Sequence, residues 1–195
     1  VGGDTKVLVG QLLYFSMRAK GMREAMLSGV IIQQLGISKD DIARAVLPLL
    51  DAEDARLREK ARNLLGEVES SPSHKGPDFS RYESIIRERK ADVPQGLIDH
   101  MYATSPDAAL ASLATVYLDK DEAKALVDQV RGEDDAHAVD RLSQRQEWWA
   151  HLYVVAMMEK NPSLRTSEVV RRLDADTNPL VREKVSKLKD KLQPK

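Results

Sequence analysis

The 195-residue sequence contains no cysteine. This absence excludes a disulfide-stabilised scaffold, a cysteine-ligated zinc or iron–sulfur centre and a cysteine nucleophile. An excess of charge of one sign is also lacking: the chain has 30 Lys and Arg and 31 Asp and Glu, so the net charge of −1 gives no general attraction to nucleic acid. Aromatic residues make up only 5%, whereas Ala, Leu, Lys, Arg and Glu are abundant, and this balance favours helix over sheet.

Long hydrophobic runs are absent as well. The longest nearly apolar run, residues 148–158, has 11 residues, whereas a membrane-spanning helix needs about 20. We therefore expect no membrane insertion. The chain starts at Val1 and shows no apolar leader, so we expect a soluble protein that is either cytoplasmic or exported after removal of a leader. No oligomer and no cofactor are predicted.

Apolar residues recur at spacings of three and four along most of the chain, and no segment alternates with a period of two. We predict helices near 5–19, 22–35, 39–50, 54–69, 79–91, 95–103, 106–118, 121–131, 136–159 (with a break allowed inside it), 163–173 and 179–191. Pro48 should kink the third of these helices. Residues 70–78 hold two Pro, one Gly and three Ser, which predicts a flexible surface linker between two helical groups of one domain, 1–195.

Two segments of the chain match each other, residues 49–61 and 172–185. In both, a predicted helix ends in Leu-Asp-Ala and an acidic residue, and a short turn then leads to an apolar residue followed by Arg-Glu-Lys. Arg58 and Arg182 are 124 positions apart, which is about three periods of 41, within the usual spacing of paired-helix repeats.

With these motifs the chain resembles a HEAT-like (armadillo-type) α-helical repeat protein, most clearly over residues 47–68 and 169–189. The resemblance implies an all-α fold, a right-handed α-α superhelix (a short α-solenoid) of about four to five helix pairs. Stacked pairs of this kind bury a continuous core. The resemblance also implies structural roles, tying the inter-helix turns to adjacent repeats, for Asp51, Arg58, Asp174 and Arg182.

Catalytic motifs are missing from the sequence. It has no phosphate-binding loop, no Gly-x-Gly-x-x-Gly and no Gly-x-Ser-x-Gly, and every pair of carboxylates that we can name falls on a predicted exposed face. We therefore predict that the protein is not an enzyme. The expected function is a protein–protein interaction or scaffold module with an unknown protein partner.

Residues 148–158 include both tryptophans of the chain. A helix that is apolar all round is normally buried, so we predict a central helix packed on both sides; the alternative is an aromatic-lined groove that meets a partner. The C-terminal region 160–195 carries a charge balance of +5, and the region 119–147 carries −4. The candidate partner-binding residues from the aromatic and basic segments are Trp148, His151, Tyr153, Arg171, Arg172, Lys184 and Lys187.

Two alternative functions remain open at this stage. One is nucleic-acid binding through the basic C-terminal helices, possible but not favoured, including the DNA-glycosylase-like activity that some HEAT-like proteins have. The other is small-ligand binding near Trp148 and Tyr153.

Metal binding is not predicted. Asp174, Asp176 and Asn178 are spaced like the start of a calcium loop, but Pro179 and Val185 stand where such a loop needs Gly and Glu. We expect the two carboxylates and Asn178 to cap the last helix instead.

Overall fold

The computed structural model describes residues 11, 14–15, 36–69, 76–89 and 93–190. Their regular structure is all helical, with no strand among them. The predicted helix 22–35, all of the predicted helix 5–19 except residues 11 and 14–15, and most of the predicted linker 70–78 lie outside the described residues. The chain divides into two compact units, residues 1–100 and 101–195, and this boundary falls inside a helix rather than at the predicted linker.

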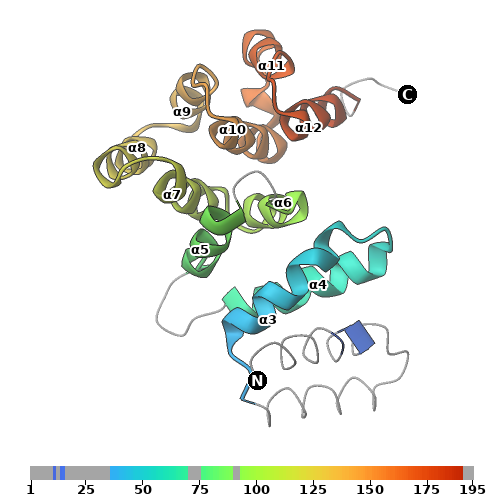
Figure 1. Ribbon diagram of the computed structural model, residues 1–195. Helices are drawn as coiled ribbons and strands as arrows, with labels where there is room; N and C mark the ends of the chain where they lie inside the picture. The colour runs from blue at the N-terminus through green and yellow to red at the C-terminus, as the bar shows by residue number, and fades with distance from the viewer. Residues whose placement is uncertain (1–10, 12–13, 16–35, 70–75, 90–92, 191–195) are drawn as a thin grey trace. The chain divides into compact units, whose positions relative to one another are not determined.

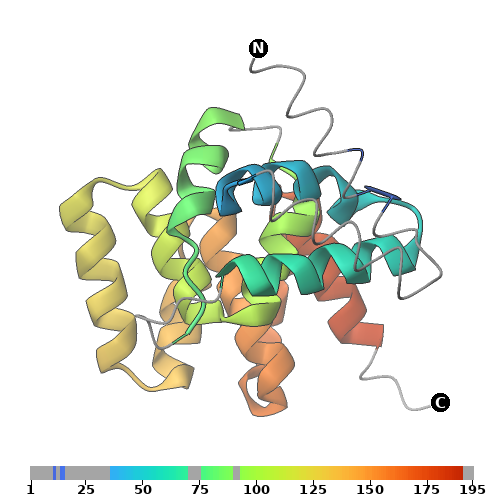
Figure 2. The same ribbon diagram turned by 90° about the horizontal axis from the view of Figure 1, so that it is seen from below.

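The first unit contains α3 (Lys39–Val46), the 3-10 helix η1 (Leu47–Asp51), α4 (Ala55–Glu69), α5 (Ser80–Arg89) and the start of α6 (Gln95–Thr104). Helices α3 and α4 form a hairpin and lie side by side in both views (Figures 1 and 2). The change from α3 to a 3-10 helix comes at the predicted kink, because Pro48 lacks an N–H and its ring clashes with the preceding turn.

The second unit holds two rows of helices in Figure 1, with α7, α10 and α12 in one row and α8, α9 and α11 in the other. Their bounds are α7 (Pro106–Tyr117), α8 (Lys120–Gly132), α9 (Asp135–Leu142), α10 (Trp148–Lys160), the 3-10 helix η3 (Pro162–Leu164), α11 (Ser167–Asp174) and α12 (Pro179–Asp190). The region predicted as one helix, 136–159, is therefore two helices. The polar run 143–147 interrupts the apolar stripe and allows the chain to turn between them.

Helix α10 is the centre of the second unit. It packs against α7, α9, α12 and η3, and nine of its thirteen residues are buried. The prediction of a buried helix at 148–158 is confirmed, with Trp148 and Met157 only half-buried. Within the described part of the chain, no helix has both the length and the apolar character that crossing a membrane requires.

Helix α6 approaches η1 very closely in the first unit. A Cβ atom placed on Gly96 would lie 2.7 Å from Leu50 Cβ and 2.8 Å from the Leu50 carbonyl oxygen. The Gly96 N–H donates to Asp51 Oδ1 at 2.8 Å. The absence of a side chain at this position allows the backbones to come together and the turn after η1 to be held against α6.

Candidate functional site

The two matching sequence segments form the same turn. Arg58 Nη1 donates to the carbonyl oxygens of Ala52 and Glu53 at 2.6 and 2.7 Å. Arg182 Nη1 donates to the carbonyl oxygens six and five residues before it, Asp176 and Thr177, at 2.9 and 3.2 Å. In each case an arginine in the second helix of a pair clamps the turn that precedes that helix.

The caps of these second helices also correspond. Asp54 Oδ1 accepts from the Arg56 N–H at 2.8 Å, and Asn178 Oδ1 accepts from the Leu180 N–H at 2.9 Å. Every one of these contacts recurs at the offset of 124 residues seen in the sequence. The backbone is closed in the same way although only the second turn contains a proline.

The aspartates of the two turns differ. Asp51 holds its turn against α6, whereas Asp174 forms an exposed ion pair with Lys189 at 2.7 Å. In the second turn it is Asp176 that reaches a neighbouring helix, through a hydrogen bond between its carboxylate and Nδ1 of His151 on α10. Asp176 also accepts from the Asn178 N–H at 2.6 Å, within the turn before α12. Of the three residues predicted to cap the last helix, Asn178 is the one that accepts from an N–H of α12, that of Leu180.

A buried polar cluster in the first unit escaped the sequence analysis. Tyr82 donates its hydroxyl hydrogen to Glu69 Oε1 at 2.6 Å, and His100 Nε2 lies 2.7 Å from the same oxygen. Burial, together with the hydrogen bond to Glu69, raises the pKa of the Tyr82 hydroxyl. The sequence analysis considered only pairs of carboxylates, on exposed faces, and did not single out Glu69, which is 2% exposed. Its position four residues after buried Leu65 was the available signal.

The three candidate residues of α10 lie in different environments. His151 and Tyr153 are buried; the His151 Nε2 atom lies 2.8 Å from the Arg145 carbonyl oxygen, and the Tyr153 hydroxyl donates to Asp107 Oδ1 at 3.0 Å. Trp148 is half-buried and packs edge-on against Tyr117, with ring centroids 5.9 Å apart. Of the three, Trp148 is the one that reaches solvent.

Acidic neighbours partly neutralise the C-terminal basic residues. Arg172 pairs with Asp140 at 2.7 Å and with Glu168, and Lys187 pairs with Glu183 one turn away. Arg171 is exposed, and Lys184 is half-buried. These ion pairs reduce the positive charge that a phosphate backbone would meet.

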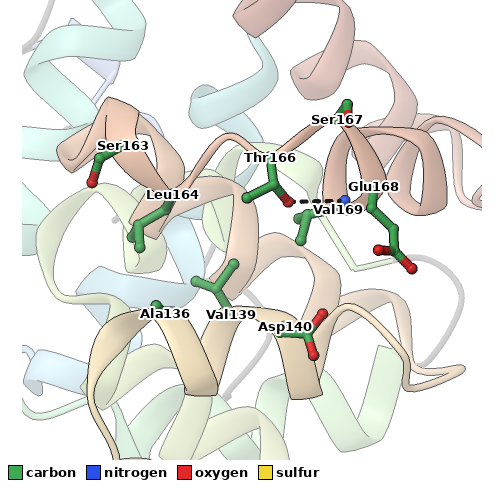
Figure 3. Close-up of a pocket in the computed structure, with 9 residues that line it drawn as sticks. All are labelled: Ala136, Val139, Asp140, Ser163, Leu164, Thr166, Ser167, Glu168 and Val169. Atoms are coloured by element: carbon green, nitrogen blue, oxygen red, sulfur yellow. Dashed lines mark hydrogen bonds between the residues drawn. The ribbon is translucent and has the colours of Figure 1, made fainter.

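A cleft of about 400 Å³ lies between α9 and the segment formed by η3 and the start of α11. Figure 3 shows that Val139, Leu164 and Val169 point toward one another across it. The residues that line it are Ala136, Val139, Asp140, Ser163, Leu164, Thr166, Ser167, Glu168 and Val169. None of the sequence-predicted partner-binding residues is among them.

One end of the cleft is acidic. Asp140 from α9 and Glu168 from α11 lie at this end in Figure 3, and their side chains are 59% and 61% exposed. Arg172 pairs with both, and it also donates to Ser143 Oγ at 3.0 Å. Two carboxylates therefore share one guanidinium, which leaves a net negative charge beside apolar walls.

Helix α9 begins with an ion pair that should give a measurable pH response. The hydrogen bond to Asp134 raises the pKa of His137 above its ordinary 6.5, and hydrogen bonds from the His137 backbone and ring lower the pKa of Asp134 below its ordinary 3.8. The raised pKa of His137 contributes stability that is present at low pH and is lost as the pH rises through that pKa. The lowered pKa of Asp134 contributes stability that is present at high pH and is lost as the pH falls through that pKa. The ion pair therefore stabilises the fold in the pH range between the two pKa values.

We expect an NMR titration to place the pKa of His137 above 6.5. In Asp134→Asn the pKa should fall toward the ordinary value, while helix α9 persists because Asn caps as well as Asp. An unchanged pKa of His137 in this variant would show that Asp134 does not cause the raised pKa.

No group of three or more His, Asp or Glu side chains is arranged to hold a metal ion among the residues that the structure describes. Comparisons with protein-family models, with curated proteins and with solved structures give no match for this chain.

Proposed function

We propose that this chain is a HEAT-like helical repeat protein and acts as a non-catalytic protein–protein interaction module. The fold that belongs to this proposal is a right-handed α-α superhelix of about four to five helix pairs. The repeated arginine-clamped turn supports the repeat class, since the same set of contacts recurs 124 residues apart. In such proteins each helix pair buries its apolar face on its neighbours.

If the two turns are equivalent, the two arginines should contribute equally to stability. Arg58→Met and Arg182→Met each remove bonds to two turn carbonyls, and we expect each to lower the free energy of unfolding by about 1–2 kcal/mol. Arg62→Met, at an exposed position of α4, is the control and should change it by less than about 0.5 kcal/mol. Urea unfolding followed by circular dichroism measures all three. A loss at one turn without a loss at the other would contradict the equivalence.

The binding function is carried by one observation, the cleft between α9 and α11. Val139, Leu164 and Val169 form its apolar floor and are 2, 7 and 3% exposed. The combination of an apolar floor with a charged edge is typical of surfaces that receive a side chain of another protein. The burial of Tyr153 and the ion pairs of Arg172 and Lys187 give less support to a ligand site at α10 or to a nucleic-acid surface.

Affinity purification of the tagged chain from lysate of its source cells, with and without nuclease, tests this function. We expect a protein that is retained after nuclease treatment, is identified by mass spectrometry and, when made separately, binds the purified chain at one-to-one stoichiometry. Binding that disappears with nuclease would favour the nucleic-acid alternative. Turnover of a substrate by the purified chain would contradict a non-catalytic role.

A further inference from the structure

The strongest unassigned feature is the cleft between α9 and α11. We propose that it docks a partner segment in which an apolar side chain enters between Val139, Leu164 and Val169 while a Lys or Arg of the same segment lies beside Asp140 and Glu168. The inference rests on the proposed interaction function and names the chemistry of the partner.

The apolar side chain of the proposed partner segment is inferred from the apolar residues that line the cleft. At about 400 Å³, the cleft is near the lower end of the range of about 300–1,000 Å³ that ligand sites occupy. A site of this size holds an apolar side chain together with part of the segment that carries it, but not a whole helix face. The opposite end from the carboxylates is marked by Ser163, whose hydroxyl and N–H both bond to Asn161 Oδ1. This end therefore offers little charge to an incoming group.

The positive charge of the proposed partner segment is inferred from the two carboxylates at the acidic end of the cleft. Asp140 and Glu168 are both more than half exposed and share Arg172 as their cation; Gln144 adds a neutral donor to Asp140 at 3.0 Å. The net charge of this end stays negative, so a basic side chain is attracted and an acidic one is repelled. Arg165 is not among the residues that line the cleft, and its guanidinium Nε donates to the Met158 carbonyl oxygen at 2.8 Å.

An anionic partner group is disfavoured even though the cleft includes the start of α11. Thr166 Oγ1 already accepts from the Val169 N–H at 3.3 Å (Figure 3), and Glu168 places a carboxylate in the first turn. The positive end of this helix is thus met by groups of the chain itself. What remains open for a partner is the apolar space and the outer side of the two carboxylates.

The test uses two blocked peptides of glycine and serine that carry a central leucine, followed two positions later by lysine in one and by glutamate in the other. NMR spectra of the full-length ¹⁵N-labelled chain report where each peptide binds. We expect the lysine peptide to shift amide signals in 136–140 and 163–169, and the glutamate peptide to bind at least about fivefold more weakly. Raising the ionic strength from about 0.1 M to about 1 M shortens the screening length from about 10 to 3 Å and should reduce this preference.

Variants separate the two halves of the site. Ala136→Arg fills the cleft from an exposed position and should abolish binding, whereas Ala125→Arg, at an exposed position of α8, is the matched control and should leave it unchanged. Glu168→Gln should weaken the lysine peptide by up to about fivefold and leave the glutamate peptide no weaker than before.

Several results would overturn the proposal. Equal affinity for both peptides would remove the role of Asp140 and Glu168. Signal shifts only outside the cleft, or no shifts at all, would show that the cleft is not the docking site. If the purified partner still bound the chain in that case, the proposed interaction function would stand, but with a different site. Shifts of the same residues on concentrating the chain alone would assign the cleft to a second copy.

Discussion

Replacing Glu69 with alanine is expected to lower the free energy of unfolding by about 3–4 kcal/mol. The Glu69 carboxylate is buried and accepts from Tyr82 and pairs with His100, so its removal leaves two buried polar groups without their partner and opens a cavity. Leaving one buried polar group without its partner typically costs about 1–3 kcal/mol, and here two groups lose theirs. Urea unfolding at neutral pH, followed by circular dichroism, measures the change.

The control for this effect is Glu67→Ala, two positions earlier in the same helix. Glu67 is exposed, so the same substitution changes helix propensity equally but removes no buried contact. We expect a change of less than about 0.5 kcal/mol. If both variants lost the same stability, the cluster of Glu69, Tyr82 and His100 would have no special role in the first unit.

Two glycine-to-alanine substitutions are expected to act in opposite directions. In Gly96→Ala the new methyl group would lie within 2.8 Å of Leu50 backbone and Cβ atoms, which cannot move aside as the end of a flexible side chain could. Overpacking of this kind costs about 1–3 kcal/mol, more than the gain of up to about 1 kcal/mol from the better helix former. We therefore expect Gly96→Ala to destabilise the protein by about 1–2 kcal/mol.

In Gly66→Ala, inside helix α4, a Cβ atom would meet nothing within 4 Å. The gain in helix propensity is then unopposed, and we expect stabilisation by about 0.5–1 kcal/mol. Denaturant midpoints of the two variants, compared with the parent chain, decide the result. Stabilisation by both substitutions would show that α6 and η1 are not in close contact.

Most helix positions could be predicted from the sequence because they follow from local signals. The periodic apolar residues and the proline and serine at the start of α7 place it at 106–118, and the structure has it at Pro106–Tyr117. The predicted helix 136–159, in which a break was allowed, is two helices in the structure, because the polar run 143–147 interrupts the apolar stripe and the chain turns between α9 and α10. Periodicity describes the faces of a helix, and by itself it does not decide whether a short polar run ends the helix or lies on its exposed face.

The candidate site was much less predictable. The resemblance to helical repeat proteins implied structural roles for Arg58 and Arg182, but the carbonyls that they bind depend on the shape of each turn. It did not reveal that Asp176, with one residue inserted in its turn, reaches α10. Cleft residues such as Val139 and Val169 look like ordinary core positions, because the open space beside them depends on how far apart two helices lie.

Hydrogen–deuterium exchange of the full chain, with and without the purified protein partner, tests most directly the claim that a partner binds at the cleft. We expect slower amide exchange in α9 and in residues 163–169 when the partner is bound, with little change at Trp148 or in α12. Protection confined to α12, or to the start of α10 around Trp148, would contradict the claim and place the interaction on the basic or the aromatic surface instead.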